Sequence, residues 1–145
     1  MDESDARRLV SEARVARLAT VNESGGADLV PVVFALIGDR LVTAVDHKPK
    51  RTLALRRLAN VAANPAVSVL ADHYEDDWSR LWWVRADGLA RIAEPASADH
   101  ARAVELLSGR YEQYRRRPPE GPAIVIEFER WSGWSAGSPA ANDAR

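Results

Sequence analysis

The residues of this chain with the clearest capacity for chemistry form one short basic stretch, residues 46–52 (DHKPKRT), which contains both lysines of the sequence. Residues 53–63 follow it with helical periodicity, so three cations lie at or just before the N-terminus of a predicted helix. That end of a helix already carries the positive pole of the dipole and free N–H donors, so a bound anion would stabilise it. The stretch is therefore either a solvated basic turn or a phosphate site formed by backbone donors and the side chains of Lys48, Lys50, Arg51 and Thr52.

The elements on either side of the basic stretch would hold it in place. Residues 40–45 before it are apolar and β-branched, which predicts a buried strand. In the helix after it, the apolar spacing predicts one inward face and one solvent face. The inward face would comprise Leu55, Leu58, Ala59 and Ala62, and the solvent face Arg56, Arg57 and Asn60. Asn64-Pro65 ends the helix.

The remaining pattern predicts two further helices and six strands in all. A first helix runs from a cap at Ser4 or Asp5 to about Ala13, and a third, starting near Ser97, covers 98–111 with an inner face of Ala101, Val104, Leu107 and Tyr111. The strands are predicted over 15–22, 28–36, 40–45, 66–71, 78–91 and 123–129, with a bulge or turn at Asp87-Gly88 and with Pro31 marking an edge. Because hairpin connections dominate, we expect a mainly β fold with helices, an antiparallel β-barrel.

Length and composition limit the class of protein. The 145 residues suffice for a single domain, which we place over residues 1–137, followed by a disordered tail over 138–145. A formal net charge of −1 gives no general attraction to nucleic acid or to an anionic membrane. The absence of cysteine excludes disulfides, thiolate metal sites and a cysteine nucleophile. The acidic N-terminus and the lack of a long apolar run argue against a signal peptide or a membrane span, so we expect a cytoplasmic protein.

Other groups of reactive side chains lack the spacing of known catalytic or metal sites. His73 lies among four carboxylates, those of Asp72, Glu75, Asp76 and Asp77, but the spacing fits no metal motif, so we interpret the segment as an acidic loop and predict no metal site. There is no Ser-His-Asp order and no evident pair of carboxylates at a strand end, so no catalytic residue is assigned. If the protein is an enzyme, a cofactor carries the reaction.

Five tryptophans are a further feature of the sequence. On a strand, Trp78 and Trp82 would share one face and Trp83 would take the other, while Trp131 and Trp134 follow the last predicted strand. One face is expected to belong to the core. The other would expose large aromatic rings, which indicates a subunit interface, a stacking wall for a ligand, or both.

Four segments together resemble one known family: residues 15–20 (VARLAT), 29–34 (LVPVVF), 43–52 (TAVDHKPKRT) and 64–70 (NPAVSVL). With the order of elements, they are similar to the flavin/deazaflavin oxidoreductase superfamily, the split barrel of pyridoxamine 5′-phosphate oxidase, and in particular to its small F420-dependent branch. The resemblance extends from about Val15 to Trp134. It implies a six-stranded antiparallel split β-barrel of the FMN-binding type and a homodimer with cofactor sites at the interface.

The resemblance also implies roles for individual residues. Those expected to bind the cofactor are Pro31, Val32 and Val33 along the ring, Thr43, Ala44 and Val45 beneath the ring and ribityl chain, Lys48, Lys50, Arg51 and Thr52 at the phosphate, and Trp78 from the second subunit. Ala44 departs from the pattern, because relatives often have a hydroxyl there. Arg56, Arg57 and Arg115 to Arg117 are further candidates for the oligoglutamate tail of F420.

The expected function follows from the same resemblance. It implies an oxidoreductase that transfers hydride between reduced coenzyme F420 and an electron-poor organic acceptor, with no nucleic acid or membrane partner. One alternative is an FMN-dependent oxidase or reductase on the same scaffold, since FMN shares the ring shape, ribityl chain and first phosphate. Another is a non-catalytic protein that carries or sequesters F420.

Overall fold

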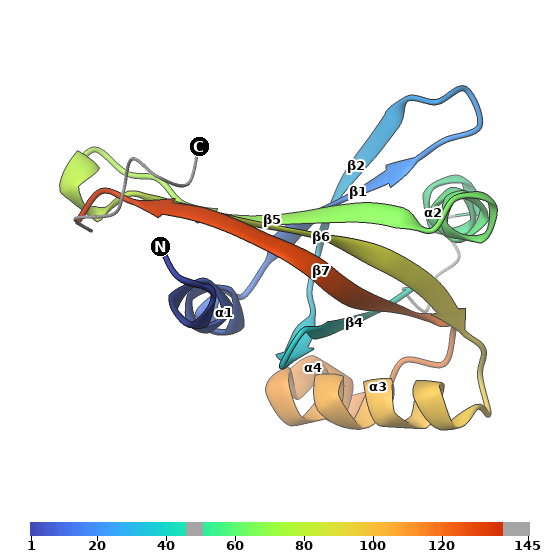
Figure 1. The fold of residues 1–145 in the computed structure, drawn as a ribbon. Coiled ribbons are helices and arrows are strands. Elements are labelled where there is room, and N and C mark those ends of the chain that lie inside the picture. The colour runs from blue at the N-terminus through green and yellow to red at the C-terminus, as the bar shows by residue number, and fades with distance from the viewer. Residues whose placement is uncertain (46–50, 138–145) are drawn as a thin grey trace.

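The computed structural model describes residues 1–45 and 51–137, and Figure 1 shows their arrangement. Lys48, Lys50 and the predicted tail over 138–145 lie outside the described residues. The elements in chain order are α1 (Glu3–Glu12), β1 (Ala16–Val21), β2 (Ala27–Val32), β3 (Ala35–Ile37), β4 (Arg40–Ala44), α2 (Arg51–Ala63), β5 (Ala66–His73), the 3₁₀ helix η1 (Trp78–Arg80), β6 (Trp82–Ala93), α3 (Ala98–Arg110), α4 (Glu112–Arg116) and β7 (Ala123–Ser135).

The strands form one curled antiparallel sheet in the order β2-β1-β5-β6-β7-β4-β3. Its two edge strands, β2 and β3, are consecutive in the chain and are separated only by Val33 and Phe34. The sheet must therefore curl to bring its two edges together, which produces the half-barrel seen in Figure 1. The described part has seven strands where six were predicted, because the segment 28–36 changes partner at Val33 and is divided between β1 and β4.

Two sequence signals within the sheet are confirmed. Pro31 lies on β2, an edge strand, where its missing N–H leaves no gap in a ladder. The register between β6 and β7 shifts at Asp87-Gly88, as the predicted bulge requires. A Cβ atom at Gly88 would lie 2.1 Å from the carbonyl oxygen of Glu127, so only glycine fits this close approach of two backbones.

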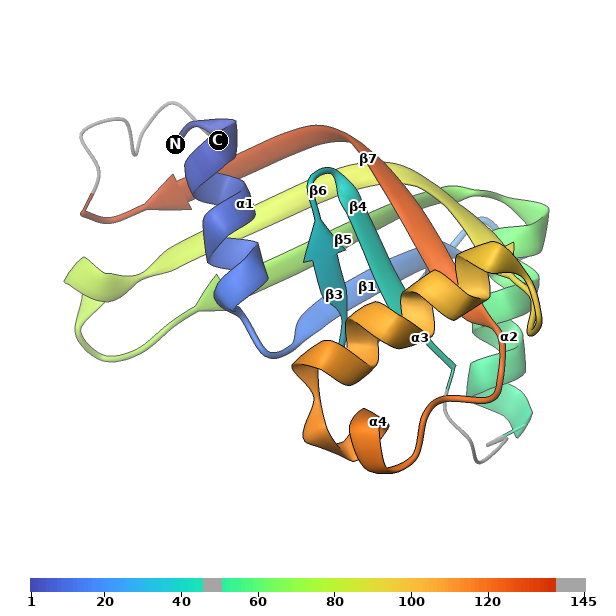
Figure 2. The ribbon, with the colours of Figure 1, turned by 90° about the horizontal axis from the view of Figure 1, so that it is seen from below.

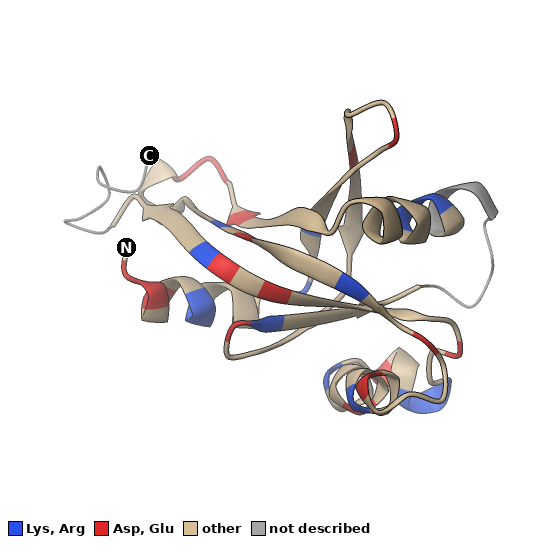
Figure 3. Cartoon of the chain, turned by 45° about the vertical axis from the view of Figure 1, so that its right-hand side comes forward, with Lys and Arg blue, Asp and Glu red and all other residues tan. Residues whose placement is uncertain are grey.

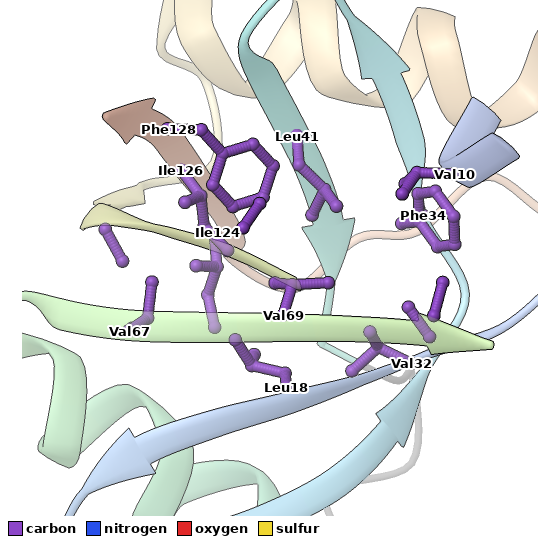
Figure 4. Close-up of a cluster of buried hydrophobic side chains, with 14 of the residues drawn as sticks. Val10, Leu18, Val32, Phe34, Leu41, Val67, Val69, Ile124, Ile126 and Phe128 are labelled. Carbon is purple, nitrogen blue, oxygen red and sulfur yellow. The ribbon is translucent and has the colours of Figure 1, made fainter. Parts of the chain in front are cut away.

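The main core fills the inside of the curled sheet. Figure 4 shows its side chains converging from β1, β2, β4, β5 and β7. Phe34, Leu18, Leu41, Ile124 and Ile126 have no measurable exposure. Each fully buried side chain of this size contributes about 1.5–3 kcal/mol relative to an exposed one.

A second apolar cluster lies outside the sheet, where α3 crosses β3 and β4 (Figure 2). Its buried members include Val42, Ala103, Leu107 and Val125. β4 and β7 are therefore covered on both faces at this end, which accounts for the nearly continuous apolar run over 123–126 that predicted the last strand.

The helices agree with the sequence pattern to different degrees. Ser97 caps α3 as predicted, whereas α1 is capped by Asp2, one turn earlier than expected. The inner face of α3 is centred on Ala103 and Leu107, and Ala101, predicted to face inward, is exposed. The prediction for α2 is only partly confirmed, since Leu58 packs against the core and Arg56 is exposed. It is wrong for the other positions: Leu55, Ala59 and Ala62 are exposed, Asn60 and Val61 are buried, and Arg57 is half-buried.

The strand ends also differ from prediction. Trp78 lies in η1 and not on a strand, so it does not share a strand face with Trp82. β7 continues to Ser135, so Trp131 and Trp134 belong to it and pair with β6. The apolar run that predicted this strand ends at Phe128, and the polar residues beyond it gave no signal that the strand continues. No helix in the described part combines the length and apolar character needed to cross a membrane.

Candidate functional site

The candidate site lies at the end of the barrel where β4 stops and α2 starts. Ala44, at the end of β4, pairs with Ala123, at the beginning of β7. Ala123 also pairs with Ala93, at the end of β6, so the three strands meet at this end of the barrel. Val45 continues this contact by donating its N–H to the carbonyl of Pro122 at 3.1 Å. The predicted phosphate segment therefore leaves the barrel at a well-fixed strand end.

The bend between β2 and β3 reaches the same strand. The Thr43 hydroxyl, buried in β4, donates to the carbonyl oxygen of Val33 at 2.7 Å. Val33 itself is 37% exposed, and Val32 and Val45 are buried. Val33 and Thr43 are therefore in contact, and the Thr43 hydroxyl is already occupied by the protein. The cofactor-binding roles of Val33, Thr43 and Val45 stay predictions.

Two residues at the end of α3 hold this bend, and sequence reasoning gave neither of them that role. The Tyr111 hydroxyl lies 2.9 Å from the carbonyl oxygen of Phe34 and accepts the N–H of the same residue at 3.1 Å. Arg110 donates to that carbonyl at 3.1 Å and lies over the Phe34 ring, 4.7 Å from its centroid. Edge strands that switch partner leave unpaired backbone groups, and these side chains satisfy them.

α2 is fixed to the β1–β2 hairpin by a buried amide. The Asn60 side chain donates to the Thr20 hydroxyl at 3.0 Å and to Asp28 Oδ2 at 2.8 Å. Asn22 donates to the other oxygen of Asp28 at 3.0 Å, and Arg56 forms an ion pair with this carboxylate at 3.2 Å. These contacts, led by the Asn60 hydrogen bond, hold the pKa of Asp28 below its ordinary value against the opposing effect of burial.

The charge on α2 is of one sign. The helix has arginines but no Asp or Glu along its length, and its first turn has no acidic residue (Figure 3). Arg56 is exposed and forms an ion pair with Asp28, whereas the side chain of Arg57 is half-buried. The Nε of Arg57 is buried without a hydrogen-bond partner, and burial lowers the pKa of its guanidinium while Tyr114 opposes that change. An anion at the N-terminus of this helix would meet the positive end of the helix dipole with no acidic side chain in the first turn.

The predicted site residues are only partly assembled in one chain. Pro31 is exposed on the edge strand, and the side chain of Ala44 packs in the cluster beneath α3. Arg51 and Thr52 lie in the first turn of α2, where a phosphate site would need their backbone N–H groups. The assignment for Lys48 and Lys50 stays a prediction.

Trp78 lies at the opposite end of the sheet. β5 starts directly after α2 and runs eight residues before the hairpin that contains η1, a length of about 26 Å. Trp78 is 75% exposed, and Asp77 caps its short helix by accepting from Ser79. One chain therefore does not bring Trp78 near the start of α2.

The remaining sequence candidates have structural partners. His73 is paired with Glu75, which also lies 3.4 Å from Arg80. Within the described ranges, no three His, Asp or Glu residues are grouped so that they could hold a metal ion. Trp131 donates to Asp39 at 3.0 Å, stacks edge-on against Phe128 and lies beneath Arg7, which makes it a packing residue.

The geometry is suited to binding more than to acid or base catalysis. The described residues offer a partly exposed apolar edge at Val33 and a helix, α2, whose first turn has no acidic residue. This combination fits a flat, partly apolar ligand with an anionic group. Asn60 and Arg110, which help to position these parts, could not be found from the sequence because polar residues on helices normally indicate solvent-facing positions. Tyr111 was predicted to face inward, but its hydrogen bonds to Phe34 were not.

Comparison with known proteins agrees with this fold. The family model described as pyridoxamine 5′-phosphate oxidase matches residues 3–135, and the chain belongs to this family. No curated protein sequence matches it.

Several solved structures share the fold. A conserved hypothetical protein from Mycobacterium tuberculosis has a TM-score of 0.74 and 23% identity, covering 94% of this chain and 86% of that one. A FAD-binding protein from Mesorhizobium loti has a TM-score of 0.69 and 21% identity, covering 92% and 94%. The heme storage protein HutZ from Vibrio cholerae has a TM-score of 0.69 and 16% identity, covering 92% and 93%. At such identities the likeness establishes the fold alone.

Proposed function

We propose that this member of the pyridoxamine 5′-phosphate oxidase family binds coenzyme F420 and uses it as an oxidoreductase acting on an electron-poor organic acceptor. The observation that carries the proposal is the position of α2, which starts at the barrel end where β4 stops and has no acidic residue in its first turn. An anionic cofactor bound there would face N–H donors and cations together. The resemblance of residues 43–52 to the F420-dependent branch supports the deazaflavin in particular.

The residues present fit such a cofactor. The unpartnered Nε of Arg57 and the acid-free start of α2 favour an anionic tail, and the exposed edge at Pro31 and Val33 offers an apolar surface to a planar ring. Lys48, Lys50, Arg51 and Thr52 would hold the phosphate. The deazaflavin, when bound, supplies the hydride, and the chain's own residues orient it and exclude water. We assign no side-chain acid or base.

A homodimer is part of this proposal, because Trp78 is too far from α2 to contribute within one chain. The outer face of β2, β1, β5 and β6 supports it. Leu29 and Leu89 are 66% and 47% exposed there, beside a hollow of about 330 Å³ that Val21, Ser68 and Asp87 help to line. Acidic and basic side chains occur on the same face, as a self-complementary contact requires. A second copy would then deliver Trp78 to the site.

One titration with three ligands tests the cofactor assignment. The purified protein is titrated with F420, FMN and hemin in parallel, and tryptophan fluorescence is followed because Trp78 is expected near the ring. Tight binding of F420 with quenching that Trp78→Phe reduces would support the proposal. Preference for FMN would favour the flavin alternative, which the FAD-binding neighbour makes reasonable, and preference for hemin would overturn both.

A second assay separates an enzyme from a carrier. Reduced F420 is mixed with catalytic amounts of protein and a panel of quinones and enones, and its oxidation is followed by absorbance. Turnover above the rate without protein supports the oxidoreductase. A tight complex whose reduced cofactor is inert to the whole panel would instead identify a carrier or sequestering protein.

A further inference from the structure

A pocket of about 210 Å³ lies on the outer face of the sheet, between α3 and the strands β3, β4 and β7. Its apolar lining consists of Val42, Ala103 and Val125, which are buried, and of Ile37 and Leu106, which are partly open to solvent. Figure 2 shows α3 crossing these strands. The pocket therefore combines a buried apolar surface with access from outside.

The pocket exists because the side chains beneath α3 are small. Five of the eight buried members of the second apolar cluster are alanines: Ala35, Ala44, Ala93, Ala103 and Ala123. Protein interiors rarely leave voids much larger than a water molecule, and the atoms around such a void lose contacts that a ligand would restore. An apolar cavity of about 150 Å³ is enough to hold benzene, so this pocket has room for one ring with a small substituent.

A network of four charged side chains lies at one side of the pocket. Arg40, which lines it, donates to Glu127 Oε2 through Nε at 2.8 Å and through Nη2 at 2.7 Å. Arg91 donates to the same oxygen at 2.9 Å and to Asp99, another lining residue, at 3.0 Å. These two guanidiniums and two carboxylates balance one another, so they hold the strands and α3 together without attracting an ion.

Arg102 is the further cation of the pocket lining, and it is less firmly held than Arg40. Its partner, Glu105, lies one turn along α3 at 2.9 Å and mostly in solvent. An exposed pair of this kind contributes little to stability, so Arg102 can exchange it for another carboxylate. A carboxylate inside the pocket would be less hydrated than Glu105, and its charge-assisted hydrogen bonds to the guanidinium would be stronger.

We propose that this pocket binds a small aromatic monocarboxylate, with the ring against Val42, Val125 and Leu106 and the carboxylate on Arg102. The site is separate from the candidate cofactor site. Arg40 begins β4, and Ala44, at which the strand ends, lies about 13 Å farther along it. A neutral molecule of the same shape gains only the apolar contacts, and a cation is repelled by Arg102.

The test titrates the purified full-length protein with benzoate, benzyl alcohol and benzylamine, and follows backbone amide shifts by NMR. Benzoate is expected to bind with a dissociation constant of about 0.1–1 mM, benzyl alcohol at least about fivefold more weakly, and benzylamine not measurably. The shifts should be centred on residues 37–42 and 99–106. No cofactor is needed, so the result is independent of whether the protein binds F420.

Three variants assign the contacts. Arg102→Gln should weaken benzoate binding about 5- to 10-fold and leave benzyl alcohol unchanged. Leu106→Trp fills the pocket from a half-buried position and should weaken both ligands. Arg116→Gln is the matched control, because Arg116 forms an exposed pair with Glu112 at 3.1 Å on α4, and it should change neither affinity by more than about twofold.

Several results would overturn the inference. Equal affinities for benzoate and benzyl alcohol would remove the role of Arg102 and the carboxylate class with it. Equal losses in Arg102→Gln and Arg116→Gln would show a general effect of charge. Shifts centred on other residues, or no saturable binding of benzoate up to about 10 mM, would refute the pocket as a ligand site.

Discussion

The helices α1 and α2 pack against opposite ends of the same sheet by different chemistry (Figure 2). α1 places Ala6 and Val10 against the core, each 2% exposed, and its arginines lie outside. α2 turns Asn60 and Arg57 inward and leaves Leu55 57% exposed. An apolar helix face is stabilised by contact with the core alone, whereas buried polar side chains need hydrogen-bond or charge partners. Asn60 has them in Thr20 and Asp28, whereas the buried Nε of Arg57 has no hydrogen-bond partner among the described residues. We therefore assign structural support to α1 and propose ligand binding for α2.

The largest expected effect is on binding at the start of α2. The double substitution Lys50→Ala with Arg51→Ala removes charge-assisted hydrogen bonds to the phosphate, and each such bond is worth about 1.5–3 kcal/mol of binding free energy. The measurement is the dissociation constant for F420, with Arg8→Ala on α1 as the control of equal charge type. Unchanged affinity in the double variant would refute the phosphate assignment and, with it, the division of roles between the helices.

The next largest effect concerns the buried side chains of each helix. Val10→Ala on α1 removes two buried methyl groups and is expected to lower the free energy of unfolding by about 2 kcal/mol while leaving F420 affinity unchanged. Denaturant unfolding and a cofactor titration on the same preparation measure both quantities. A loss of affinity in this variant would show that α1 also serves the site.

Asn60→Ala on α2 should lower both the free energy of unfolding and the affinity for F420. It leaves the Thr20 hydroxyl without the amide donor and releases α2 from the hairpin, which costs about 2 kcal/mol of unfolding free energy. Because α2 then loses its fixed position, F420 affinity should fall as well, and the exposed Ala62→Ser is the matched control. Loss of stability with full affinity would mean that the site does not depend on how α2 is held.

A smaller effect is expected in how salt changes the stability of variants in the two helices. Arg7 fixes α1 by an exposed ion pair with Asp39 at 2.7 Å, whereas Asn60 fixes α2 through a neutral amide. Arg7→Gln should destabilise the protein only slightly, and the difference from wild type should vanish at about 1 M salt because the pair is then screened. The deficit of Asn60→Ala should persist at the same salt concentration. Equal salt responses would contradict this distinction.

The pH dependence follows from Asp28. Its pKa is lowered in the folded protein, first by the Asn60 hydrogen bond and then by that from Asn22. A carboxyl with a depressed folded pKa contributes stability above its unfolded pKa, near 4, and loses it as pH falls through the lower folded value. Asp28→Asn should therefore be less stable than wild type at neutral pH, with the difference shrinking below about pH 4. A constant difference at every pH, measured by urea unfolding, would exclude this linkage.

Much of the fold could be predicted from the sequence, because its signals are local. The apolar run at Ile124 to Ile126, the turn at Gly25 and the proline on β2 each specify a strand or an edge without reference to the rest of the chain. The split of β2 from β3 could not be predicted in this way. It depends on Tyr111 and Arg110 meeting Phe34 across more than 70 residues, and no local pattern contains that contact.

The predicted inward face of α2 was wrong at Leu55, Ala59 and Ala62, though not at Leu58, for a related reason. Leucine and alanine spacing predicts burial only where an apolar surface is available, and this helix meets the polar pair Thr20 and Asp28 instead. Local rules tend to fail where function requires polar groups in the interior. The assignment of residues 43–52 to the candidate site stays a prediction, whereas Asn60, Arg110 and the buried Nε of Arg57 required the structure.

The most direct test of the central claim is amide hydrogen exchange of the protein with and without saturating F420. We expect new protection in α2, residues 51–63, and in the hairpin at 74–81 that contains Trp78, with no change in α1, residues 3–12. This result would place the ligand between α2 of one copy and the hairpin of another. Protection confined to α1, or no change in α2 at full occupancy, would contradict the assignment of the cofactor to this end of the barrel.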